Sequence, residues 1–359
     1  MIKDKVIVFS NYHIQKNSGG PPGYIYKCII DNLPSNVVLL QDVLVKNSRT
    51  LKTKFRNKIN YLTSLVYDNK RNNHVIKYIN ANCFNYKYIY FHDVFTLYKV
   101  LHLLSNKQVV ILQSHSPELP SEELYDINKD LTQLKKNRQI EKKSFERANV
   151  LVFPNKECKI LYNKLINENH NIKYLLTGIK EIKSKINYPI SQDKINLLFI
   201  GRRNDVKGFN SLIEVFKKVT KKRKDLRLFI AGGGEKIYGD NIYDLGMITT
   251  AYDWINSVDF VFSLNQQSYF DLNVIETICL GTPLIMTTTE GHEFFKNKDG
   301  IIDVTTNSLE DVLLSEKIIS KNYKKEHKLI LKAMYDEFFT GDKFKDRLEN
   351  VCMKVINEK

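Results

Sequence analysis

Short apolar runs alternate with stretches of helical periodicity along the first half of the chain. The runs are bounded by polar turns and are apolar almost throughout, which is typical of strands buried on both faces of a parallel sheet. They occupy residues 6–9, 37–40, 88–91, 109–112 and 150–153. Between them, apolar positions recur at helical spacing, as in 94–105 and 131–148. Strands and helices in this order predict βαβ units.

The same alternation starts again after a polar stretch at residues 183–194, where we place the domain linker. Beyond it, strands are expected at residues 195–200, 226–231, 259–263 and 282–286, with helices at 210–220 and 274–280. The stretch 344–356 has helical spacing, with Leu348, Val351, Cys352 and Val355 on one side.

The pattern therefore predicts an α/β chain of two Rossmann-like, doubly wound domains in series. We expect an N-terminal domain over residues 1–187, a C-terminal domain over 188–340, and a final helix over 341–359 that packs back toward the N-terminal domain. Ligands of open α/β sheets bind at the carboxyl ends of the strands. Two such domains facing each other predict a substrate cleft between them.

The composition limits the class of protein. The chain has 359 residues, 43% of them hydrophobic, which suits two folded domains rather than a disordered chain. Its formal net charge of +15 fits three kinds of partner: nucleic acid, an anionic membrane surface or a phosphorylated substrate. The basic residues do not interleave with aromatic ones in a nucleic-acid-binding module, so we expect no specific nucleic-acid partner.

Cysteine spacing and the length of the apolar runs indicate the compartment. Five cysteines are scattered along the chain without a CxxC pair, which argues against a disulfide framework and against a zinc site. No apolar stretch has the length of a signal peptide or of a membrane span. We therefore expect a cytoplasmic protein that is soluble or attached peripherally to the inner face of the plasma membrane.

A basic amphipathic pattern covers residues 51–66. Its apolar positions at helical spacing are Leu51, Phe55, Ile59, Leu62 and Val66, and its basic residues include Lys52, Lys54, Arg56 and Lys58. Such a helix can bind an anionic membrane surface. A helix that packs its apolar side on the sheet and exposes its basic side to water explains the pattern equally well.

The loop after the strand at 195–200 holds the first candidate site. It reads Gly201-Arg202-Arg203-Asn204-Asp205-Val206-Lys207-Gly208. Arg202 and Lys207 follow a buried strand, and together they can neutralise a diphosphate leaving group. A solvated basic turn would have the same composition.

A second candidate site lies where a helix is expected to begin near Leu272. The N–H groups at a helix N-terminus, here at Asp271, Leu272 and Asn273, can bind an anion. Glu276 follows about one turn later, within reach of a ribose diol, although the helix dipole alone also favours a glutamate there. Gly281 is typical of a helix end.

Two features of the first half can complete a nucleotide site. Gly19 and Gly20 lie in a glycine-rich turn after the first strand, where backbone N–H groups can approach a phosphate. A plain turn before a helix would also use them. His115 follows the strand at 109–112, and a histidine near a strand end is more often structural, as we interpret His92.

From residue 196 to 293 the chain resembles the C-terminal domain of retaining glycosyltransferase family 4, which has the GT-B fold, and in particular its bacterial surface-polysaccharide type. The matching features, in chain order, are Gly201-Arg202, Lys207-Gly208, Gly232–Gly234, Leu245-Gly246, Val258-Asp259, and Phe270-Asp271-Leu272 with Glu276, Gly281 and Pro283. Weaker likeness covers residues 18–24, 111–115, 126–155 and 176–179.

The resemblance implies a function and a set of roles. It implies transfer of a sugar, with retention of configuration, from a UDP- or GDP-linked donor to a glycan acceptor that is expected to be lipid-linked. His115, Arg202 and Lys207 are implied to be catalytic. The implied donor-binding residues are Gly19, Gly20, Arg202, Lys207, Gly233, Asp271, Leu272, Asn273 and Glu276. No cofactor is implied, and because the chain has no Asp-x-Asp pair, we expect positive groups to act in place of a metal ion.

One position departs from the family pattern in a way that matters. Ser268 stands where the first glutamate of a paired-Glu motif is expected to contact the donor sugar, and Asp271 stands where glycine is usual. Glu290 or Asp271 could supply the missing carboxylate. Two alternatives stay open: a non-catalytic GT-B partner of a glycosyltransferase complex, and a sugar-nucleotide epimerase of the same fold.

Overall fold

The structure is a computed structural model that describes residues 1–10, 19–48, 69–191 and 193–358. Its contacts divide the chain into two compact units, Met1–Leu176 with Phe344–Lys359, and Thr177–Lys343. The basic pattern at residues 51–66 lies outside the described residues. The sequence pattern placed a domain limit at residue 187, whereas residues 177–187 belong by their contacts to the second unit.

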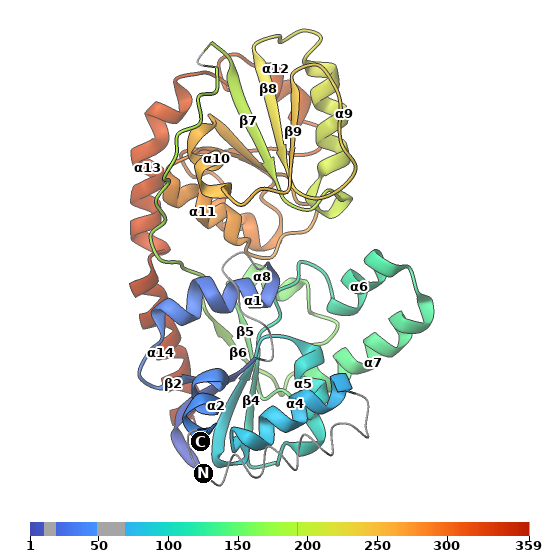
Figure 1. The fold of residues 1–359 in the computed structure, drawn as a ribbon, viewed down its shortest axis with the longest axis vertical. Helices are drawn as coiled ribbons and strands as arrows, with labels where there is room; N and C mark the ends of the chain where they lie inside the picture. Colours follow the sequence, from blue (N-terminus) through green and yellow to red (C-terminus); the bar gives the residue numbers. More distant parts are fainter. Residues whose placement is uncertain (11–18, 49–68, 192, 359) are drawn as a thin grey trace. The chain divides into compact units, whose positions relative to one another are not determined.

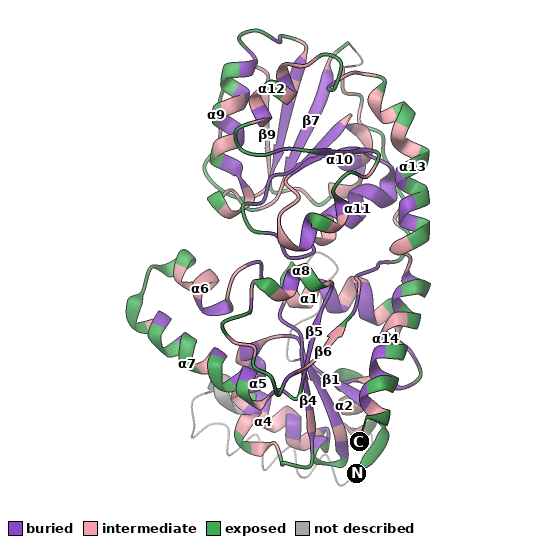
Figure 2. Ribbon diagram, turned by 180° about the vertical axis from the view of Figure 1, so that it is seen from behind, coloured by how far each residue is buried: buried purple, intermediate pink, exposed green. Residues whose placement is uncertain are grey.

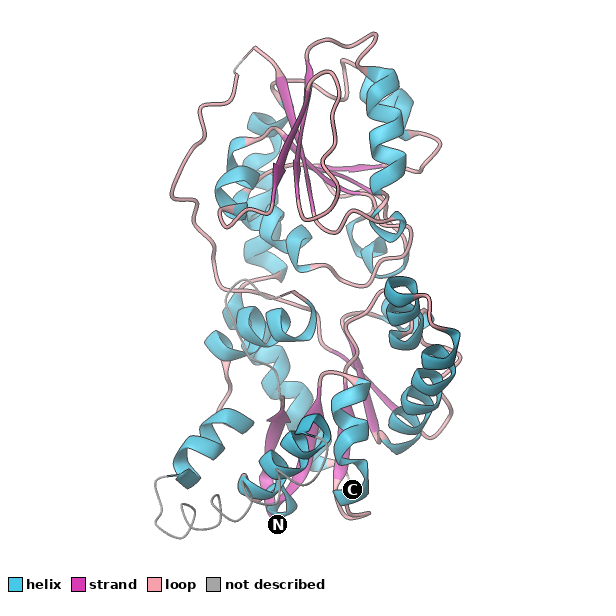
Figure 3. Cartoon of the chain, turned by 45° about the vertical axis from the view of Figure 1, so that its right-hand side comes forward, coloured by secondary structure: helices cyan, strands magenta, loops and turns pink. Residues whose placement is uncertain are grey.

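Hydrogen bonds attach the segment before the second sheet to the second unit. The Asp253 carboxylate accepts from the backbone N–H groups of Lys185 (2.6 Å) and Ile186 (3.0 Å). The Ile182 N–H donates to the Cys279 sulfur at 3.3 Å. From residue 180 to 191 the segment is a loop that contains no helix and no strand (Figure 3).

The first unit is built on a parallel sheet whose described strands have the order β2-β1-β3-β4-β5-β6. The strands are β1 (Ile2–Phe9), β2 (Val37–Leu39), β3 (Tyr86–Phe91), β4 (Val109–Leu112), β5 (Val150–Phe153) and β6 (Asn171–Tyr174). Val6, Ile7 and Val8 of β1 are fully buried. Figure 2 shows the central strands buried along most of their length, as expected for a parallel sheet covered on both faces.

Helices cover both faces of the first sheet (Figure 1). They are α1 (Gly20–Tyr24), continued by Ile25–Ile29 and Ile30–Asn32, α2 (Leu40–Ser48), α4 (Asn69–Asn80), α5 (Val94–Val100), α6 (Pro120–Asn128), α7 (Leu131–Arg147), α8 (Lys156–Ile160) and α14 (Gly341–Asn357). The helix α5 packs against both α4 and α7. Tyr24 of α1 meets Phe344 of α14, with ring centroids 6.0 Å apart.

The last helix, α14, is part of the first unit although it follows the second unit in sequence. The Tyr88 hydroxyl donates to the Ile356 carbonyl at 2.9 Å, and the Asn36 amide donates to the Glu349 carbonyl at 3.3 Å. Its buried side consists of Phe344, Leu348, Val351, Cys352 and Val355. The apolar spacing of this segment therefore builds part of the first unit's core.

The second unit contains a second parallel sheet, with the described strands in the order β12-β11-β10-β7-β8-β9. Its strands are β7 (Ile195–Ile200), β8 (Leu226–Ala231), β9 (Ile242–Gly246), β10 (Phe260–Ser263), β11 (Leu284–Met286) and β12 (Ile301–Asp303). Its helices are α9 (Phe209–Val219), α10 (Ala251–Ser257), α11 (Leu272–Leu280), α12 (Leu309–Leu314) and α13 (Tyr323–Phe338). The helices α9 and α12 share one face, and α10, α11 and α13 the other (Figure 1).

Both units are thus doubly wound α/β units of the Rossmann type, as the sequence predicted. All five cysteines are buried and form no disulfide. Across the described ranges, no helix combines the length and the apolar character that crossing a membrane requires.

Candidate active site

The loop after β7 separates two arginines that are adjacent in sequence. Arg203 turns inward and forms a two-pronged ion pair with Asp244 of β9, at 2.6 and 2.7 Å. Its side chain is 4% exposed and that of Asp244 is 3% exposed. Arg202 is exposed. The geometry therefore makes Arg203 a structural residue and presents Arg202, the predicted ligand residue, at the surface of the unit.

Gly208 ends the loop in a conformation that other residues rarely adopt. Its φ is +65°, and an added Cβ would lie 2.2 Å from the Leu264 carbonyl oxygen. The turn brings the beginning of α9 against the segment that follows β10, where the Gln266 N–H donates to the Val206 carbonyl at 2.9 Å. Any side chain at Gly208 would push these two segments apart. The glycine thus positions the neighbouring Lys207.

Lys207 forms the centre of a polar cluster at the carboxyl ends of β7 and β10. Its ammonium lies 2.6 Å from Asp271 Oδ2, and the Asn265 amide donates to the same oxygen at 2.5 Å. The side chains of Lys207 and Asp271 are 17% and 19% exposed. Asp271 immediately precedes α11 but does not cap it with its side chain. Its carboxylate is turned to Lys207 instead.

The positive charge of Lys207 keeps the neighbouring Asp271 ionised. Burial by itself would raise the pKa of Asp271, but the adjacent Lys207 charge and the hydrogen bonds from Lys207 and Asn265 outweigh it and hold that pKa well below its usual range. His292 lies beside the pair, and its Nε2 accepts from the Asp271 N–H at 3.4 Å. Burial lowers the pKa of His292 to about 4. The cluster at neutral pH is therefore an ion pair beside a neutral imidazole.

Burial of His292 predicts a loss of stability in mild acid. The folded protein keeps His292 neutral down to a pKa of about 4, whereas the unfolded chain takes up a proton near pH 6.5. The unfolded state therefore gains protons first as the pH falls below 6.5. We expect this group to lower the free energy of unfolding by about 1 kcal/mol between pH 7 and 5.5.

The matched variants are His292→Gln, which keeps an acceptor near the Asp271 N–H, and His102→Gln at an exposed histidine. Urea unfolding at both pH values should show a weaker pH dependence for His292→Gln and an unchanged one for His102→Gln. Equal pH dependence in all three proteins would contradict the assignment.

Glu276 is held by a residue that the sequence motif does not include. It is 5% exposed and lies one turn into α11 among buried apolar residues. The Tyr252 hydroxyl of α10 donates to Glu276 Oε1 at 3.0 Å. This bond fixes the carboxylate in one orientation, which a group that recognises a pair of vicinal hydroxyls requires.

The backbone N–H of Ser268 binds a carboxylate from elsewhere in the chain. Ser268 is fully buried, and its hydroxyl lies 2.9 Å from the Thr289 hydroxyl. Its backbone N–H donates to Glu290 Oε2 at 2.9 Å. Glu290 has a φ of +35°, and a residue other than glycine in that region carries strain of the kind that collects at functional sites.

The glycine triplet after β8 brings a third loop to the same edge of the sheet. An added Cβ at Gly232, whose φ is +142°, would lie 2.1 Å from the Gly201 carbonyl oxygen. The Gly232 N–H donates to the Gly246 carbonyl at 2.9 Å. The predicted residue Gly233 lies in this close-packed turn, next to Met247. The loops after β7, β8 and β9 therefore converge at their carboxyl ends.

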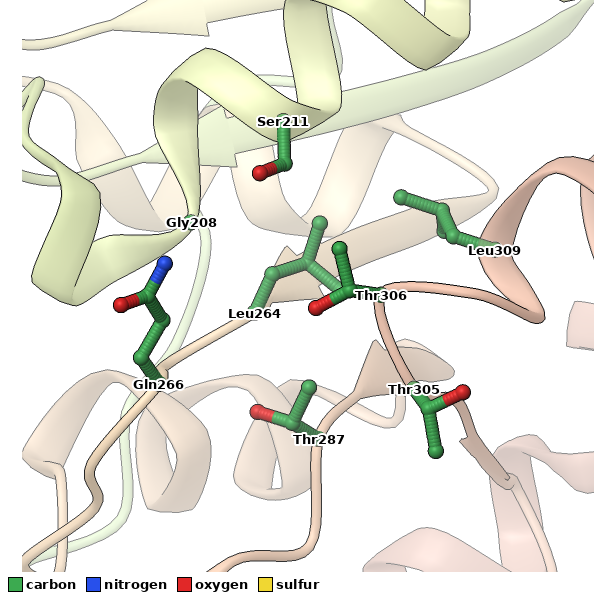
Figure 4. A pocket seen from close by; sticks show the side chains of 8 residues that line it. All are labelled: Gly208, Ser211, Leu264, Gln266, Thr287, Thr305, Thr306 and Leu309. Atoms are coloured by element: carbon green, nitrogen blue, oxygen red, sulfur yellow. The ribbon is translucent and has the colours of Figure 1, made fainter.

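A small pocket adjoins the Lys207 loop on the side of α9 and β12 (Figure 4). Its cavity volume is about 20 Å³. Five of its eight lining residues carry a hydroxyl or amide side chain, and the lining consists of Gly208, Ser211, Leu264, Gln266, Thr287, Thr305, Thr306 and Leu309. Without a charged group, this pocket suits uncharged polar atoms rather than a phosphate.

The predicted residues of the first unit lie at the carboxyl ends of its own strands. Gly19 precedes α1, and Gly20, with a φ of +57°, begins it. A side chain added at either glycine would meet no atom within 4 Å among the described residues. Tyr24 of α1 packs on the ring of His115, which follows β4, with centroids 4.3 Å apart. Gly19, Gly20 and His115 are thus joined through one short helix.

No group of three or more metal-ligating side chains occurs in the part of the chain that the structure describes. In the second unit, Lys207, Asp271 and Asn265 touch, and Glu276 and Glu290 lie on the elements next to them. The sequence motifs did not identify Asn265, Tyr252 or His292. These three residues are recognised only from their contacts in the folded structure, because each is separated in sequence from the residue that it contacts.

Residues 194–315 match the family model described as glycosyl transferases group 1. A comparison with curated protein sequences finds no match. Among solved structures, the chain is similar to sucrose-phosphate synthase from Thermosynechococcus elongatus, with 15% identity over 80% of each chain and a TM-score of 0.61.

Two further solved structures have the same fold. A variant of Staphylococcus aureus TarM, solved with UDP and α-GlcNAc-glycerol among its ligands, is 17% identical over 75% of this chain and 55% of its own, with a TM-score of 0.59. The trehalose-6-phosphate synthase OtsA is 10% identical over 98% of this chain and 99% of its own, with a TM-score of 0.61. The chain thus has the GT-B fold of two Rossmann-like units, and the part of its second unit that carries Lys207, Asp271 and Glu276 matches the group 1 glycosyl transferases.

Proposed function

We propose that the chain is a glycosyltransferase that uses a nucleoside-diphosphate sugar, UDP- or GDP-linked, as its donor. The observation that carries the proposal is the position of Lys207 beside the beginning of α11, at the carboxyl ends of β7 and β10. Both lie within the matched residues 194–315. The presence of UDP in the TarM complex, a protein of the same fold, supports a nucleotide as the ligand.

The proposed roles follow from charge and position. Lys207 and Arg202 stabilise the negative charge that develops on the diphosphate as the glycosidic bond breaks. The N–H groups of Leu272 and Asn273 at the beginning of α11 add backbone donors. Glu276, oriented by Tyr252, accepts from the ribose hydroxyls, and the backbone of Gly233 lines the nucleotide. Gly19, Gly20 and His115 of the first unit are proposed as further residues that contact the donor.

The finer features of the reaction are part of the proposal. We assign the protein to retaining family 4, with a glycan acceptor that is lipid-linked and belongs to a cell-surface polysaccharide. No metal or other cofactor takes part in the proposed reaction, since Lys207 and Arg202 supply the positive charge. Residues 51–66 bind the inner face of the plasma membrane and bring the enzyme to such an acceptor.

Replacing Asp271 should tighten nucleotide binding. Its carboxylate forms an ion pair with Lys207 and repels an incoming diphosphate. Asp271→Asn removes that charge and leaves an amide of the same size. We expect roughly tenfold tighter UDP or GDP binding, or about 1.4 kcal/mol, measured by isothermal titration calorimetry. Asp205→Asn, at an exposed carboxylate in the same loop, should change nothing, and weaker binding by Asp271→Asn would contradict the competition.

Glu290 takes the donor-sugar role that Ser268 cannot fill. Its carboxylate is anchored at the backbone of position 268 by the 2.9 Å bond. Glu290→Gln should therefore lower kcat roughly 100-fold while leaving UDP or GDP affinity unchanged. Glu293→Gln, at an exposed glutamate of the short helix Glu290–Phe295 that also holds Glu290, is the control. If Glu290→Gln is as active as Glu293→Gln, Glu290 does not take the donor-sugar role.

The activity itself is tested with a panel of UDP- and GDP-sugars. The purified protein is incubated with each donor, with and without a lipid-linked glycan acceptor, and the products are identified by mass spectrometry and their anomeric configuration by NMR. The proposal expects release of UDP or GDP and a retained linkage. A changed sugar nucleotide without acceptor would indicate an epimerase, and nucleotide binding without turnover of any donor would indicate a non-catalytic partner.

A further inference from the structure

The small pocket of Figure 4 lies at the edge of the second sheet where open α/β units bind their ligands. Three of its lining residues, Leu264, Thr287 and Thr305, follow the neighbouring strands β10, β11 and β12 at their carboxyl ends. Gly208 and Ser211 come from the beginning of α9. The pocket is thus built from four separate segments of the chain that meet in the folded unit.

Three polar side chains of this pocket form no hydrogen bond within the part of the chain that the structure describes. They are the hydroxyls of Ser211 and Thr306 and the amide of Gln266. Figure 4 shows the Ser211 and Thr306 hydroxyls turned into the space between α9 and the loop after β12. These groups can therefore bind a ligand without giving up a bond within the protein.

The remaining two hydroxyls of the lining are engaged by neighbouring residues. The Thr305 hydroxyl lies 3.2 Å from the Ser308 hydroxyl. The Thr287 hydroxyl donates to the Asn265 carbonyl at 2.5 Å, and the Asn265 amide donates to Asp271 of the polar cluster. The pocket and the polar cluster are therefore joined through a single residue, Asn265.

The walls and the size of the pocket limit what can enter it. Leu264 and Leu309 are buried, with 6% and 2% of their surface exposed, and form an apolar floor. Gln266 and Thr306 are exposed, so the polar side opens to solvent. A cavity of about 20 Å³ holds one hydroxyl-sized group. None of the eight lining residues is charged, and a carboxylate or a phosphate would lose its hydration there without a counter-charge.

We propose that this pocket is a subsite for the hydroxymethyl group of an uncharged sugar. Such a group projects from a pyranose ring and can enter a pocket that is too small for the ring. Its methylene contacts Leu264 and Leu309, and its hydroxyl forms hydrogen bonds with Ser211, Gln266 and Thr306. The choice of a sugar rests on the proposed function, since the pocket adjoins the cluster that is proposed to bind the diphosphate. The donor and the acceptor can both present this group, and the experiment distinguishes them.

Methyl NMR spectra of the full chain test the subsite without turnover. With ¹³C-labelled leucine and threonine methyl groups, methyl α-D-glucopyranoside should shift the signals of Leu264, Leu309 and Thr306. Methyl α-D-xylopyranoside, which lacks the hydroxymethyl group, should bind roughly three- to tenfold more weakly, and D-glucuronate should leave these signals unchanged. No shift with the glucoside, or equal shifts with all the sugars, would overturn the proposal.

Two substitutions test the hydroxyls of the pocket. Ser211→Ala and Thr306→Val each remove one hydroxyl and keep the apolar floor. Each should weaken binding of the glucoside roughly three- to tenfold and leave binding of the xyloside unchanged. Thr132→Val, at an exposed threonine of α7 in the first unit, should bind both sugars as the unmodified protein does. Equal affinity for the glucoside in all these proteins, or a parallel loss for both sugars, would contradict the proposal.

Added nucleotides identify the source of the sugar and test the proposed function separately. If UDP-glucose or GDP-mannose displaces the glucoside while UDP and GDP do not, the pocket binds the sugar of the donor. If the glucoside stays bound, the pocket binds the acceptor. Shifts caused by the glucoside in a protein that binds neither UDP nor GDP would refute the proposed function and leave the subsite standing. Nucleotide binding without any effect of the glucoside would refute the subsite alone.

Discussion

Lys207→Ala is expected to lower the rate of sugar transfer about 100- to 1000-fold, the usual effect of removing one group that stabilises developing negative charge. The ammonium lies at the meeting point of β7, β10 and the beginning of α11. No other described side chain of the cluster carries a positive charge at neutral pH, since His292 is neutral. Loss of Lys207 therefore leaves the diphosphate with Arg202 and backbone donors alone.

Two controls separate this effect from damage to the fold. The single variant leaves the carboxylate of Asp271 without its ion-pair partner, which by itself destabilises the protein. The double variant Lys207→Ala, Asp271→Asn removes that problem and should be stable but still inactive. Lys217→Ala, at an exposed lysine of α9, should be fully active. Steady-state kinetics that show normal turnover by the double variant would remove Lys207 from the mechanism.

The second large effect concerns stability and distinguishes two neighbouring arginines. Arg203→Ala should lower the free energy of unfolding by about 3–5 kcal/mol, because it leaves the buried Asp244 carboxylate without its charge partner. Arg202→Ala, one residue earlier and exposed, should change stability by less than about 0.5 kcal/mol and instead weaken nucleotide binding.

Urea unfolding and calorimetric titration of both arginine variants test this division of roles. Asp244→Asn is the reciprocal variant, since the Arg203 fork holds the pKa of that carboxyl well below its usual range. It should be destabilised in the same way as Arg203→Ala. The division fails if Arg202→Ala proves to be the unstable variant, or if Arg203→Ala leaves the midpoint of unfolding unchanged.

The sequence predicted the parts of the fold that are apolar without interruption. β4, β5, β7 and β8 have the predicted bounds, since these strands are covered on both faces. Three strands escaped prediction, namely β6, β9 and β12. Each lies at an edge of its sheet, where one side of the backbone is unpaired and polar side chains are tolerated, so that no continuous apolar run marks it.

The candidate site was predictable in its motifs and not in its contacts. Spacing alone placed Lys207 and Glu276 on their elements, but it could not show that Asp271 turns to Lys207 rather than capping α11. The motif singled out Arg202 and left Arg203 without a role. The role of Arg203 depends on Asp244, 41 positions away in sequence.

The two histidines illustrate the same limit. The sequence assigned His115 to the ligand and His92 to the core, and spacing gave no reason to connect them. The structure brings them within 2.9 Å because β3 and β4 are neighbours in the sheet.

The most direct test of the proposed nucleotide site is the binding of UDP and GDP to the full chain, measured by isothermal titration calorimetry. We predict that at least one of them binds with a Kd between about 1 μM and 1 mM. Binding should be lost or strongly weakened in Glu276→Ala and in the double variant that combines Lys207→Ala with Asp271→Asn, and it should be kept in Lys217→Ala. Binding of neither nucleotide, or equal binding by all these proteins, would contradict a nucleotide-diphosphate site at Lys207 and Glu276.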